Sequence, residues 1–418
     1  MEKVVNVIGL VVFPLLAWGL SVHRRRFPWR VALWAVGLQI LIALFILKTS
    51  FGAGIFEWAQ RAVNQLISFS DEGAKMVFGP LADKELLQKH WGAANATIFC
   101  ITVTATIVLV SSLSSLLYYW RILPKIVAAT AWVMRKTMGT SGSESLATAA
   151  NIFMGMTEAP LLIRPYLARM TQSEMMALMT GGMATIAGGV LAAYVSFGIS
   201  AGHLLTASVM SAPAALMMAK IMFPETEESE TAGRAAEQVR SPAINSIDAL
   251  CRGATDGLML SLNVMAMLLA FVALVALANF LCTEVQQWAF ALIGISAKPA
   301  TLQTLVGWVN APFAWLMGIP KQDLVVAGSI LGERIVLNEF ISYTHLAQVQ
   351  QTLHPRTTVL ITYALCGFAN FGSIAVQIGG IGALVPERRS DLARLGMRSM
   401  IAGLLACYFT ATLVGLLL

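Results

Sequence analysis

The chain has 418 residues, of which 57% are hydrophobic and only 12% are charged. Soluble domains carry about 25% charged residues, so this composition is typical of a chain whose main solvent is lipid. The formal net charge of +6 does not indicate a nucleic-acid partner, because the basic residues cluster beside apolar runs. The cysteines are scattered and show no metal-ligand spacing. The composition therefore predicts a polytopic membrane protein that binds no nucleic acid.

Eight apolar stretches approach the roughly 20 residues that a helix needs to cross a membrane. Arginine-rich loops orient these stretches, because basic residues mark the cytoplasmic side. The sequence HRRRFPWR follows the first stretch, Arg121 and Lys125 follow the third, and PERRSDLARLGMR precedes the eighth. This bias predicts that both termini are outside. The expected spans cover residues 4–22, 31–47, 97–119, 175–197, 204–223, 258–282, 359–384 and 400–418.

Other segments are expected at the membrane surface. Residues 55–69, IFEWAQRAVNQLISF, place apolar and polar positions on opposite sides of a helix, which predicts a short interfacial helix on the outer surface. Lys220 and Asp256 fall near the ends of predicted spans, where we expect their side chains to reach out to the interface.

Residues 144–170 form an apolar segment that is broken by polar and helix-disrupting residues. Each half is too short to cross a membrane, so the segment predicts two half-helices that meet at a polar tip, a re-entrant hairpin. Irregular backbone at that depth is tolerated only where protein buries it or where it lines a cavity. The interrupting residues are Asn151, Gly155, Thr157, Glu158 and Pro160.

The second half of the chain repeats these features. The span after the hairpin contains GGMATIAGG, whose glycines each weaken a helix by about 1 kcal/mol and predict local unwinding. VAGSILGERIVLNEFISYTHL is a second broken segment, and Glu339 at its tip matches Glu158 in the first. The unwound centres, expected near Gly188 and Ser373, are separated along the chain by nearly the same interval as the two glutamates. An odd number of crossings separates the copies, so the repeat is inverted, as in many transporters.

The predicted fold is an all-α polytopic membrane protein with eight transmembrane helices and two re-entrant hairpins in an inverted repeat, with interfacial helices. We divide the chain into an N-terminal pair of spans with the interfacial helix (1–94), the first repeat (95–223), a charged cytoplasmic linker (224–245) and the second repeat (246–418).

The two hairpin carboxylates indicate function, because a carboxylate within a membrane span costs several kcal/mol. Glu158 and Glu339 could instead pin the hairpin tips by structural hydrogen bonds, or they could carry protons. Asn370 and Ser373 fall in the second unwound region, where polar side chains also serve as helix–helix contacts. Thr185 and the exposed carbonyls of half-helix ends are oxygen ligands for Na⁺ or another small cation, which the spacing alone leaves open.

Four stretches together resemble the concentrative nucleoside transporter family: NIFMGMTEAPLLIRPYL, MATIAGGVLAAY, LNEFISY and ALCGFANFGSIAVQIGG. They occur in the family's order over most of the chain. The resemblance implies a homotrimeric symporter of a cell inner membrane, not an enzyme, that imports nucleosides by an elevator-like movement. It also implies a coupling cation, commonly Na⁺ and sometimes H⁺, and no further cofactor.

The resemblance also implies site residues. Thr157 and Glu158 would face the nucleobase, with Val190 packing on it and Phe368 lining the base side. Glu339, Asn370 and Ser373 would hold the ribose hydroxyls. The Na⁺ ligands would be Asn151, the Met154 carbonyl, Thr185 and the Ile186 carbonyl.

Met156 departs from the family pattern, which usually has glutamine after the hairpin glycine. An amide donates and accepts hydrogen bonds at a pyrimidine edge, whereas a thioether does not, so the preference between purines and pyrimidines stays open. An H⁺-coupled carrier of nucleosides or related polar solutes is the alternative reading. A passive channel and a membrane-embedded enzyme are less favoured, because paired hairpins indicate alternating access and no nucleophile or metal set accompanies the carboxylates.

Overall fold

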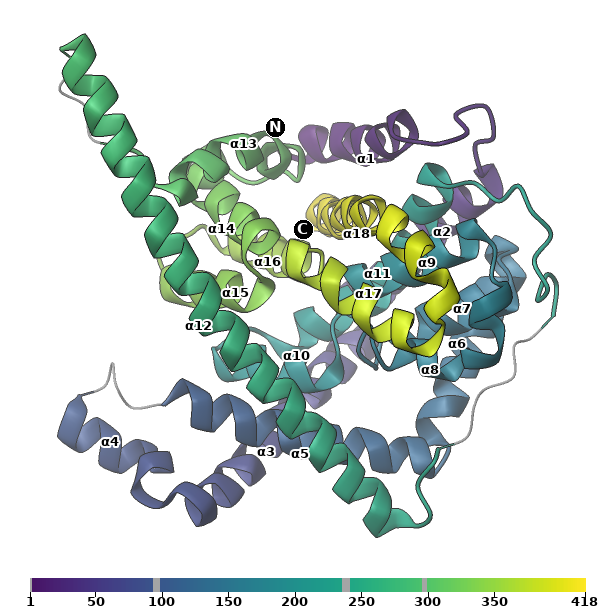
Figure 1. Ribbon diagram of the computed structural model, residues 1–418, viewed down its shortest axis with the longest axis horizontal. Helices are drawn as coiled ribbons and strands as arrows, with labels where there is room; N and C mark the ends of the chain where they lie inside the picture. Colours follow the sequence, from purple (N-terminus) through teal and green to yellow (C-terminus); the bar gives the residue numbers. More distant parts are fainter. Residues whose placement is uncertain (1, 93–97, 235–240, 295–298) are drawn as a thin grey trace.

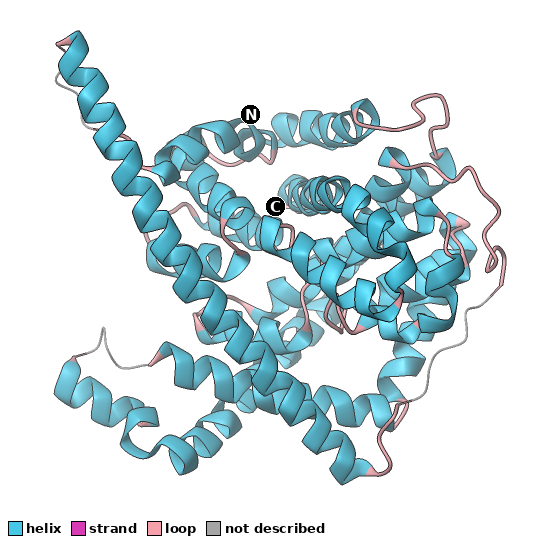
Figure 2. Cartoon of the chain, in the orientation of Figure 1, coloured by secondary structure: helices cyan, strands magenta, loops and turns pink. Residues whose placement is uncertain are grey.

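The computed structural model describes residues 2–92, 98–234, 241–294 and 299–418, and over these residues it contains helices and loops but no strand (Figures 1 and 2). Seven of the described helical segments are long and apolar enough to cross a membrane. They are α1 (Glu2–Gly19), α2 (Trp29–Lys48), α5 (Phe99–Tyr119), α9 with α10 (Gln172–Ser196), α11 (Ala201–Met222), α12 (Ser246–Ile293) and the segment Pro386–Leu417, which contains α18 (Arg389–Leu417).

The remaining predicted span, at residues 359–384, is the pair α16 (Pro355–Leu365) and α17 (Phe371–Leu384), each too short to cross alone. The prediction of an all-α polytopic membrane protein is therefore confirmed. The predicted start of the third span at residue 97 lies outside the described residues. So do the boundary between residues 94 and 95 and residues 235–240 of the predicted linker, and the division into four segments stays a prediction.

Both predicted hairpins are pairs of short helices. Hairpin 1 (residues 142–169) comprises α7 (Gly142–Asn151), α8 (Ala159–Leu162) and the 3₁₀ helix η3 (Arg164–Arg169), and hairpin 2 (residues 324–349) comprises α14 (Leu324–Val336) and α15 (Glu339–Val349). Local sequence sets their starts. Ser141 and Glu144 form a capping box at α7, and the Asn338 side chain accepts from Ile341 N at 3.0 Å to begin α15.

The predicted unwinding of both interrupted spans is confirmed. Break 1 comprises residues 185–187, between α9 (Gln172–Ala184) and α10 (Gly188–Ser196) and at the centre of GGMATIAGG, and break 2 comprises residues 366–370. Ser373 lies just beyond break 2, inside α17. Glycines at both places also allow close packing: a Cβ on Gly182 would lie 2.7 Å from Met156 Cβ, and one on Gly367 would lie 2.6 Å from Met183 O. Break 2 thus lies directly against the end of α9.

Two helices are longer than predicted. The expected interfacial helix at residues 55–69 extends through α3 (Ser50–Phe78), and the expected span at 258–282 extends through the 48 residues of α12. α12 begins where the Asn245 side chain caps Asp248 N at 2.8 Å and ends at Gly294, whose φ of 71° suits glycine. At 1.5 Å per residue α12 is about 72 Å long, and it runs along the whole molecule in Figure 1.

The spans divide into inner and outer helices. In the apolar stretch of α9 with α10, 94% of the residues are buried, and in that of α11 89% are buried. In the apolar stretch of α12, 0% are buried. α9, α11 and α18 pack on one another at the centre, with α6 (Ile122–Met138) and α13 (Leu302–Leu316) outside the hairpins. The side chains in this apolar stretch of α12 are therefore left uncovered by the described chain, which is typical of a surface that faces lipid or another subunit.

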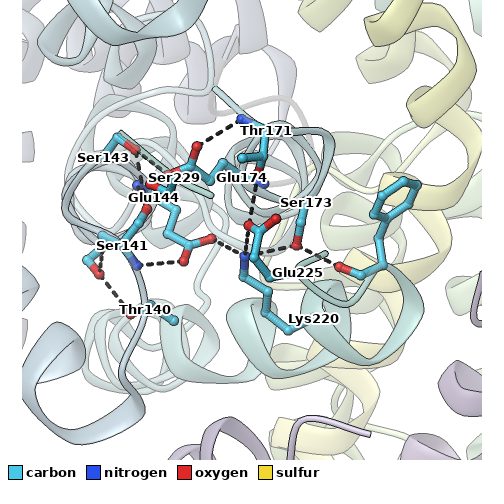
Figure 3. Close-up of polar contacts among 12 residues, drawn as sticks. Thr140, Ser141, Ser143, Glu144, Thr171, Ser173, Glu174, Lys220, Glu225 and Ser229 are labelled. Atoms are coloured by element: carbon cyan, nitrogen blue, oxygen red, sulfur yellow. Dashed lines mark hydrogen bonds and ion pairs between the residues drawn. The ribbon is translucent and has the colours of Figure 1, made fainter. Parts of the chain in front are cut away.

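Lys220 does not reach out to the interface as expected, but is buried in a polar cluster that joins three helices (Figure 3). Its Nζ lies 2.6 Å from Glu144 Oε2 at the start of α7 and 3.3 Å from Glu225 Oε2, and it donates to Ser173 Oγ at 2.9 Å. Glu174, at the start of α9, accepts from Ser143 and Ser229. The cluster fastens the base of hairpin 1 to α9 and α11. The expectation failed because carboxylates on neighbouring helices supply closer partners than water.

Candidate functional site

A cavity of about 470 Å³ lies where the hairpin tips and the two breaks meet. All the residues to which the family resemblance assigns substrate contacts line it. They are Met156, Thr157, Glu158, Val190, Glu339, Phe368, Asn370 and Ser373. Residues from the two halves of the sequence are thus brought to one cavity by the pairing of the two repeats.

One end of the cavity is built around Glu339, the first residue of α15. Tyr194 Oη donates to its Oε1 at 3.2 Å, and Asn370 Nδ2 donates to its Oε2 at 2.9 Å. The Asn370 Oδ1 in turn accepts from Ser373 N at 2.8 Å and caps α17. A carboxylate has about four lone-pair sites, so each Glu339 oxygen keeps one for a ligand hydroxyl.

The other end is the tip of hairpin 1. In the described part of the chain, Glu158 accepts one hydrogen bond, from Gly155 N to Oε2 at 3.3 Å. Thr157 and Glu158 are exposed to the cavities that they line, unlike their neighbours Ala159 and Pro160, which are buried. The hydrogen bond to Gly155 shapes the tip, and Oε1 stays available, so a structural and a ligand-binding role are compatible.

Asn151 is 1% exposed, and neither of its side-chain polar atoms has a hydrogen-bond partner among the described residues. Buried polar atoms without a partner are rare in native proteins and require an explanation. Thr185 Oγ1 donates to Gly181 O at 2.8 Å, which leaves its lone pairs for another ligand. The Met154 and Ile186 carbonyls accept no hydrogen bond that the described backbone donates. This set of oxygens fits a small hard cation such as Na⁺.

Sequence reasoning missed part of the cavity wall. α12 contributes Leu260, Asn263 and Met267 to it. Behind the wall, the Tyr194 hydroxyl of α10 holds Glu339. Asn263 carried a signal, since it is an isolated amide in an apolar run. The Tyr194 hydroxyl carried none, because a tyrosine at a helix end is ordinary.

A second cavity, of about 680 Å³, lies beside the first. Glu158, Ala187 and Leu260 line both. The second cavity extends to Asp248 and Arg252 near the start of α12. The site therefore has a polar route toward one end of the molecule.

A helical membrane protein whose two hairpin tips and two broken spans meet at a shared cavity has the architecture of a secondary transporter. Comparison with known proteins agrees. The chain matches the description "Na+ dependent nucleoside transporter N-terminus" over residues 8–81, "Nucleoside recognition" over 100–201 and "Na+ dependent nucleoside transporter C-terminus" over 203–415. The chain belongs to the Na⁺-dependent nucleoside transporter family, as the four sequence stretches predicted.

Similar proteins include solute carrier family 28 member 3 of Mus musculus, 37% identical over 432 residues, and an uncharacterised transporter of Haemophilus influenzae, 39% identical over 422 residues. The match covers 100% of this chain in each case, but 59% of the mouse protein and 98% of the bacterial one. The chain thus spans about three fifths of the length of its mouse relative.

Solved structures of the transporter CNTnw are similar throughout. Its inward-facing, substrate-bound state is 36% identical and superposes with a TM-score of 0.92, over 100% of this chain and 98% of that chain. An outward-facing state of a CNTnw variant superposes with a TM-score of 0.93, over 100% of this chain and 97% of that chain.

Proposed function

We propose that the protein is a Na⁺-coupled nucleoside symporter that imports nucleosides. The cavity between the hairpin tips carries this proposal, because it combines a hydroxyl-accepting end at Glu339 with an apolar wall and a second carboxylate at Glu158. A nucleoside has the matching chemistry, a ribose with hydroxyl groups joined to a flat base with polar edges. Melting of the purified protein across a nucleoside panel, with and without Na⁺, tests the proposal, and stabilisation by no nucleoside would contradict it.

The two ends of the cavity divide the recognition of a nucleoside. Glu339, held by Tyr194 and Asn370, accepts hydrogen bonds from the ribose hydroxyls, and Ser373 adds a hydroxyl beside them. Val190 and Phe368 supply the apolar surface for the base. Thr157 and Glu158 then meet the polar edge of the base from hairpin 1.

Met156→Gln is expected to shift preference toward pyrimidine nucleosides. Met156 lines the cavity, and its thioether fills space against a large ring without donating a hydrogen bond. A restored amide would gain a neutral hydrogen bond worth about 0.5–1.5 kcal/mol, which is a several-fold change in relative affinity. Competition by uridine, cytidine, adenosine and guanosine against one labelled nucleoside measures this ranking. An unchanged ranking would move base recognition to Thr157, Val190 or Phe368.

We propose that the coupling cation is Na⁺ and that Asn151, Thr185 and the carbonyls of Met154 and Ile186 hold it. When bound, the ion supplies positive charge between the hairpin 1 tip and break 1. These residues then keep the tip against α9, which presents Thr157 and Glu158 to the substrate. The ligands come from both the hairpin 1 tip and break 1. Ion binding therefore stabilises the ordered tip, and an ordered tip binds the ion more tightly.

Thr185→Ala is expected to weaken the Na⁺ dependence of uptake more than it lowers the maximal rate. The variant removes one oxygen from the proposed ligand set and leaves the backbone carbonyls in place. Uptake is measured as a function of Na⁺ concentration at saturating nucleoside, and a higher half-saturating Na⁺ concentration is the expected result. Uptake that ignores Na⁺ but collapses with a proton uncoupler would instead support H⁺ coupling, with Glu158 or Glu339 as the carrier.

We propose an elevator-like movement in which the hairpins, α9, α11 and α16–α17 move as one body past α12. Two features support a rigid body: break 2 touches α9 at Met183, and the Lys220 cluster ties hairpin 1 to α9 and α11. α12 instead meets the site through single side chains such as Leu260. The second cavity supports an inward-facing arrangement, the state in which the similar transporter CNTnw was solved with substrate bound.

We propose that both termini are outside and that the protein lies in a cell inner membrane. Val22 N donates to Met222 O, and Arg388 donates to Met170 O, so loops predicted to be cytoplasmic lie together at one end. Labelling of single cysteines near Arg25 and Arg389 is expected only from the cytoplasmic side. External labelling at either position would contradict the inverted-repeat topology.

We propose a homotrimer, as the family resemblance implies. The exposed apolar length of α12 is a surface that neighbouring copies and lipid would share. The mass of the protein in lipid nanodiscs tests the assembly, and a monomer at all concentrations would contradict it.

A further inference from the structure

Arg334, in the last turn of α14, is among the largest fully buried side chains of the described residues. Its Nη1 donates to Ala364 O, in the last turn of α16, and its Nη2 lies 3.4 Å from Cys407 Sγ. None of the described carboxylates forms an ion pair with it. A buried cation therefore rests on backbone carbonyl oxygen and a thiol, which is an unusual environment that needs an explanation.

The inverted repeat supplies the comparison. In the first repeat the Asn151 amide lies against Gly181 of α9. Arg334 and Ala364 are the corresponding residues of the second repeat, because the interval from Asn151 to Arg334 equals the interval from Gly181 to Ala364. The backbone agrees with this register before the hairpin tips. Met154 N donates to Ala150 O at the end of α7, and the equivalent bond after the same interval, from Leu337 N to Glu333 O, ends α14. Beyond these bonds the tip of hairpin 1 is longer, so that Glu158 and Glu339 match with an interval shorter by two residues, 181 against 183.

The side chains at the two equivalent positions differ in charge. In the first repeat a neutral amide with no hydrogen-bond partner among the described residues faces the last turn of α9. In the second repeat a guanidinium donates to the last turn of α16. The carboxyl end of a helix carries a partial negative charge, so a cation is favoured at both places. The first repeat has no covalently attached cation there, and the second repeat has one.

We propose that Arg334 is the fixed internal cation of the second repeat, and that it takes the place which the coupling cation takes in the first. The inference rests on the proposed cation coupling and extends it. Arg334 is a positioning residue: it holds the end of α14 against α16, so that Glu339 and Asn370 stay assembled without a bound ion. Only the position in the first repeat then binds an ion from solution. The protein therefore binds one coupling cation per nucleoside.

The test compares Na⁺ titrations of uridine binding for the purified full-length wild type and four variants. Arg334→Asn places in hairpin 2 the residue that hairpin 1 has, Arg334→Lys keeps the charge, and Asn151→Lys places a fixed charge in hairpin 1. Arg356→Asn is the matched control, because Arg356 also donates to backbone carbonyls, those of Gly318 and Gly415, but lies away from both breaks. Thermal melting of each variant establishes that it is folded.

For Arg334→Asn we expect uridine binding at low Na⁺ to weaken by at least about thirtyfold. High Na⁺ should restore it, with the Hill coefficient for Na⁺ rising from about one toward two as a second ion is taken up. Arg334→Lys should retain a coefficient of about one and bind uridine within about tenfold of wild type. Asn151→Lys should bind uridine equally in sodium and choline salts, and Arg356→Asn should lose stability without a change in Na⁺ dependence.

Three results would overturn the inference while the proposed function stands. They are a folded Arg334→Asn variant that Na⁺ does not restore, an Arg334→Lys variant no better than Arg334→Asn, and a folded Asn151→Lys variant whose uridine binding is lost or still requires Na⁺. If Arg334→Asn does not fold, the Asn151→Lys and Arg334→Lys results decide alone. A wild type with no ion-dependent binding of any nucleoside would overturn the proposed function itself, and this inference with it.

Discussion

Replacing Glu339 with glutamine is expected to abolish uptake of uridine and adenosine alike, with a loss of at least about a hundredfold in kcat/KM. Each carboxylate oxygen already accepts a donor, Tyr194 Oη on one and Asn370 Nδ2 on the other. A glutamine placed there turns its NH₂ group toward one of these donors, which leaves that donor buried without an acceptor. The amide also accepts fewer ribose hydroxyls than the carboxylate.

The matched control is Glu333→Gln, the same change in the same hairpin. Glu333 pairs with His345 Nδ1 at 2.8 Å and does not line the cavity of about 470 Å³. We expect this variant to keep most of the wild-type uptake at equal expression. Near-normal uptake by Glu339→Gln, or equal losses in the two variants, would show that the role of Glu339 in hairpin 2 is only structural.

Lys220→Met is expected to cause the largest loss of stability among the substitutions considered. The side chains of Lys220 and Glu144 are 6% and 2% exposed, so the variant leaves a buried carboxylate without its counter-ion. Loss of one partner of a buried ion pair costs about 3–5 kcal/mol. The midpoint of thermal unfolding of the purified protein should fall accordingly, and hairpin 1 should lose its attachment to α11.

An exposed-pair control and a double variant test whether the unpaired buried carboxylate causes this loss of stability. Lys84→Met breaks a pair of the same kind, with Asp71 at 2.6 Å, but the Lys84 side chain is 42% exposed, so we expect little change. In Lys220→Met with Glu144→Gln the buried charge is neutralised, and part of the lost stability should return. A double variant less stable than Lys220→Met would contradict the assignment of the loss to the unpaired carboxylate.

The broken helices could be predicted because polar residues and glycines interrupt their apolar runs, which a continuous transmembrane helix does not tolerate. Glu158 and Glu339 marked the hairpin tips, and Asn370 and Ser373 marked the second break within a few residues. The glycine-rich stretch GGMATIAGG likewise marked the first break, which lies at its centre. The close packing that these glycines also permit could not be predicted. Gly182 and Gly367 lie where another chain segment approaches within van der Waals distance, which a single sequence does not reveal.

The partners of buried charges could not be predicted either. Lys220 was expected to reach the membrane interface and Arg334 carried no sequence signal, yet both are buried in contact with helices that are distant in the sequence. These partners depend on how the two repeats pack against each other. Neither the composition nor the hydrophobic periodicity of the sequence determines that packing. The contribution of α12 to the cavity was missed for the same reason, since only the fold shows which side of that helix faces the site.

The central claim is tested most directly by uptake of labelled uridine into proteoliposomes with an imposed, inward Na⁺ gradient. A Na⁺-coupled symporter accumulates uridine above its external concentration, and the accumulation disappears when a Na⁺ ionophore removes the gradient. Replacing internal and external Na⁺ by choline should leave little uptake. Uridine that only equilibrates, at a rate indifferent to the Na⁺ gradient, would contradict the account and indicate a passive pathway.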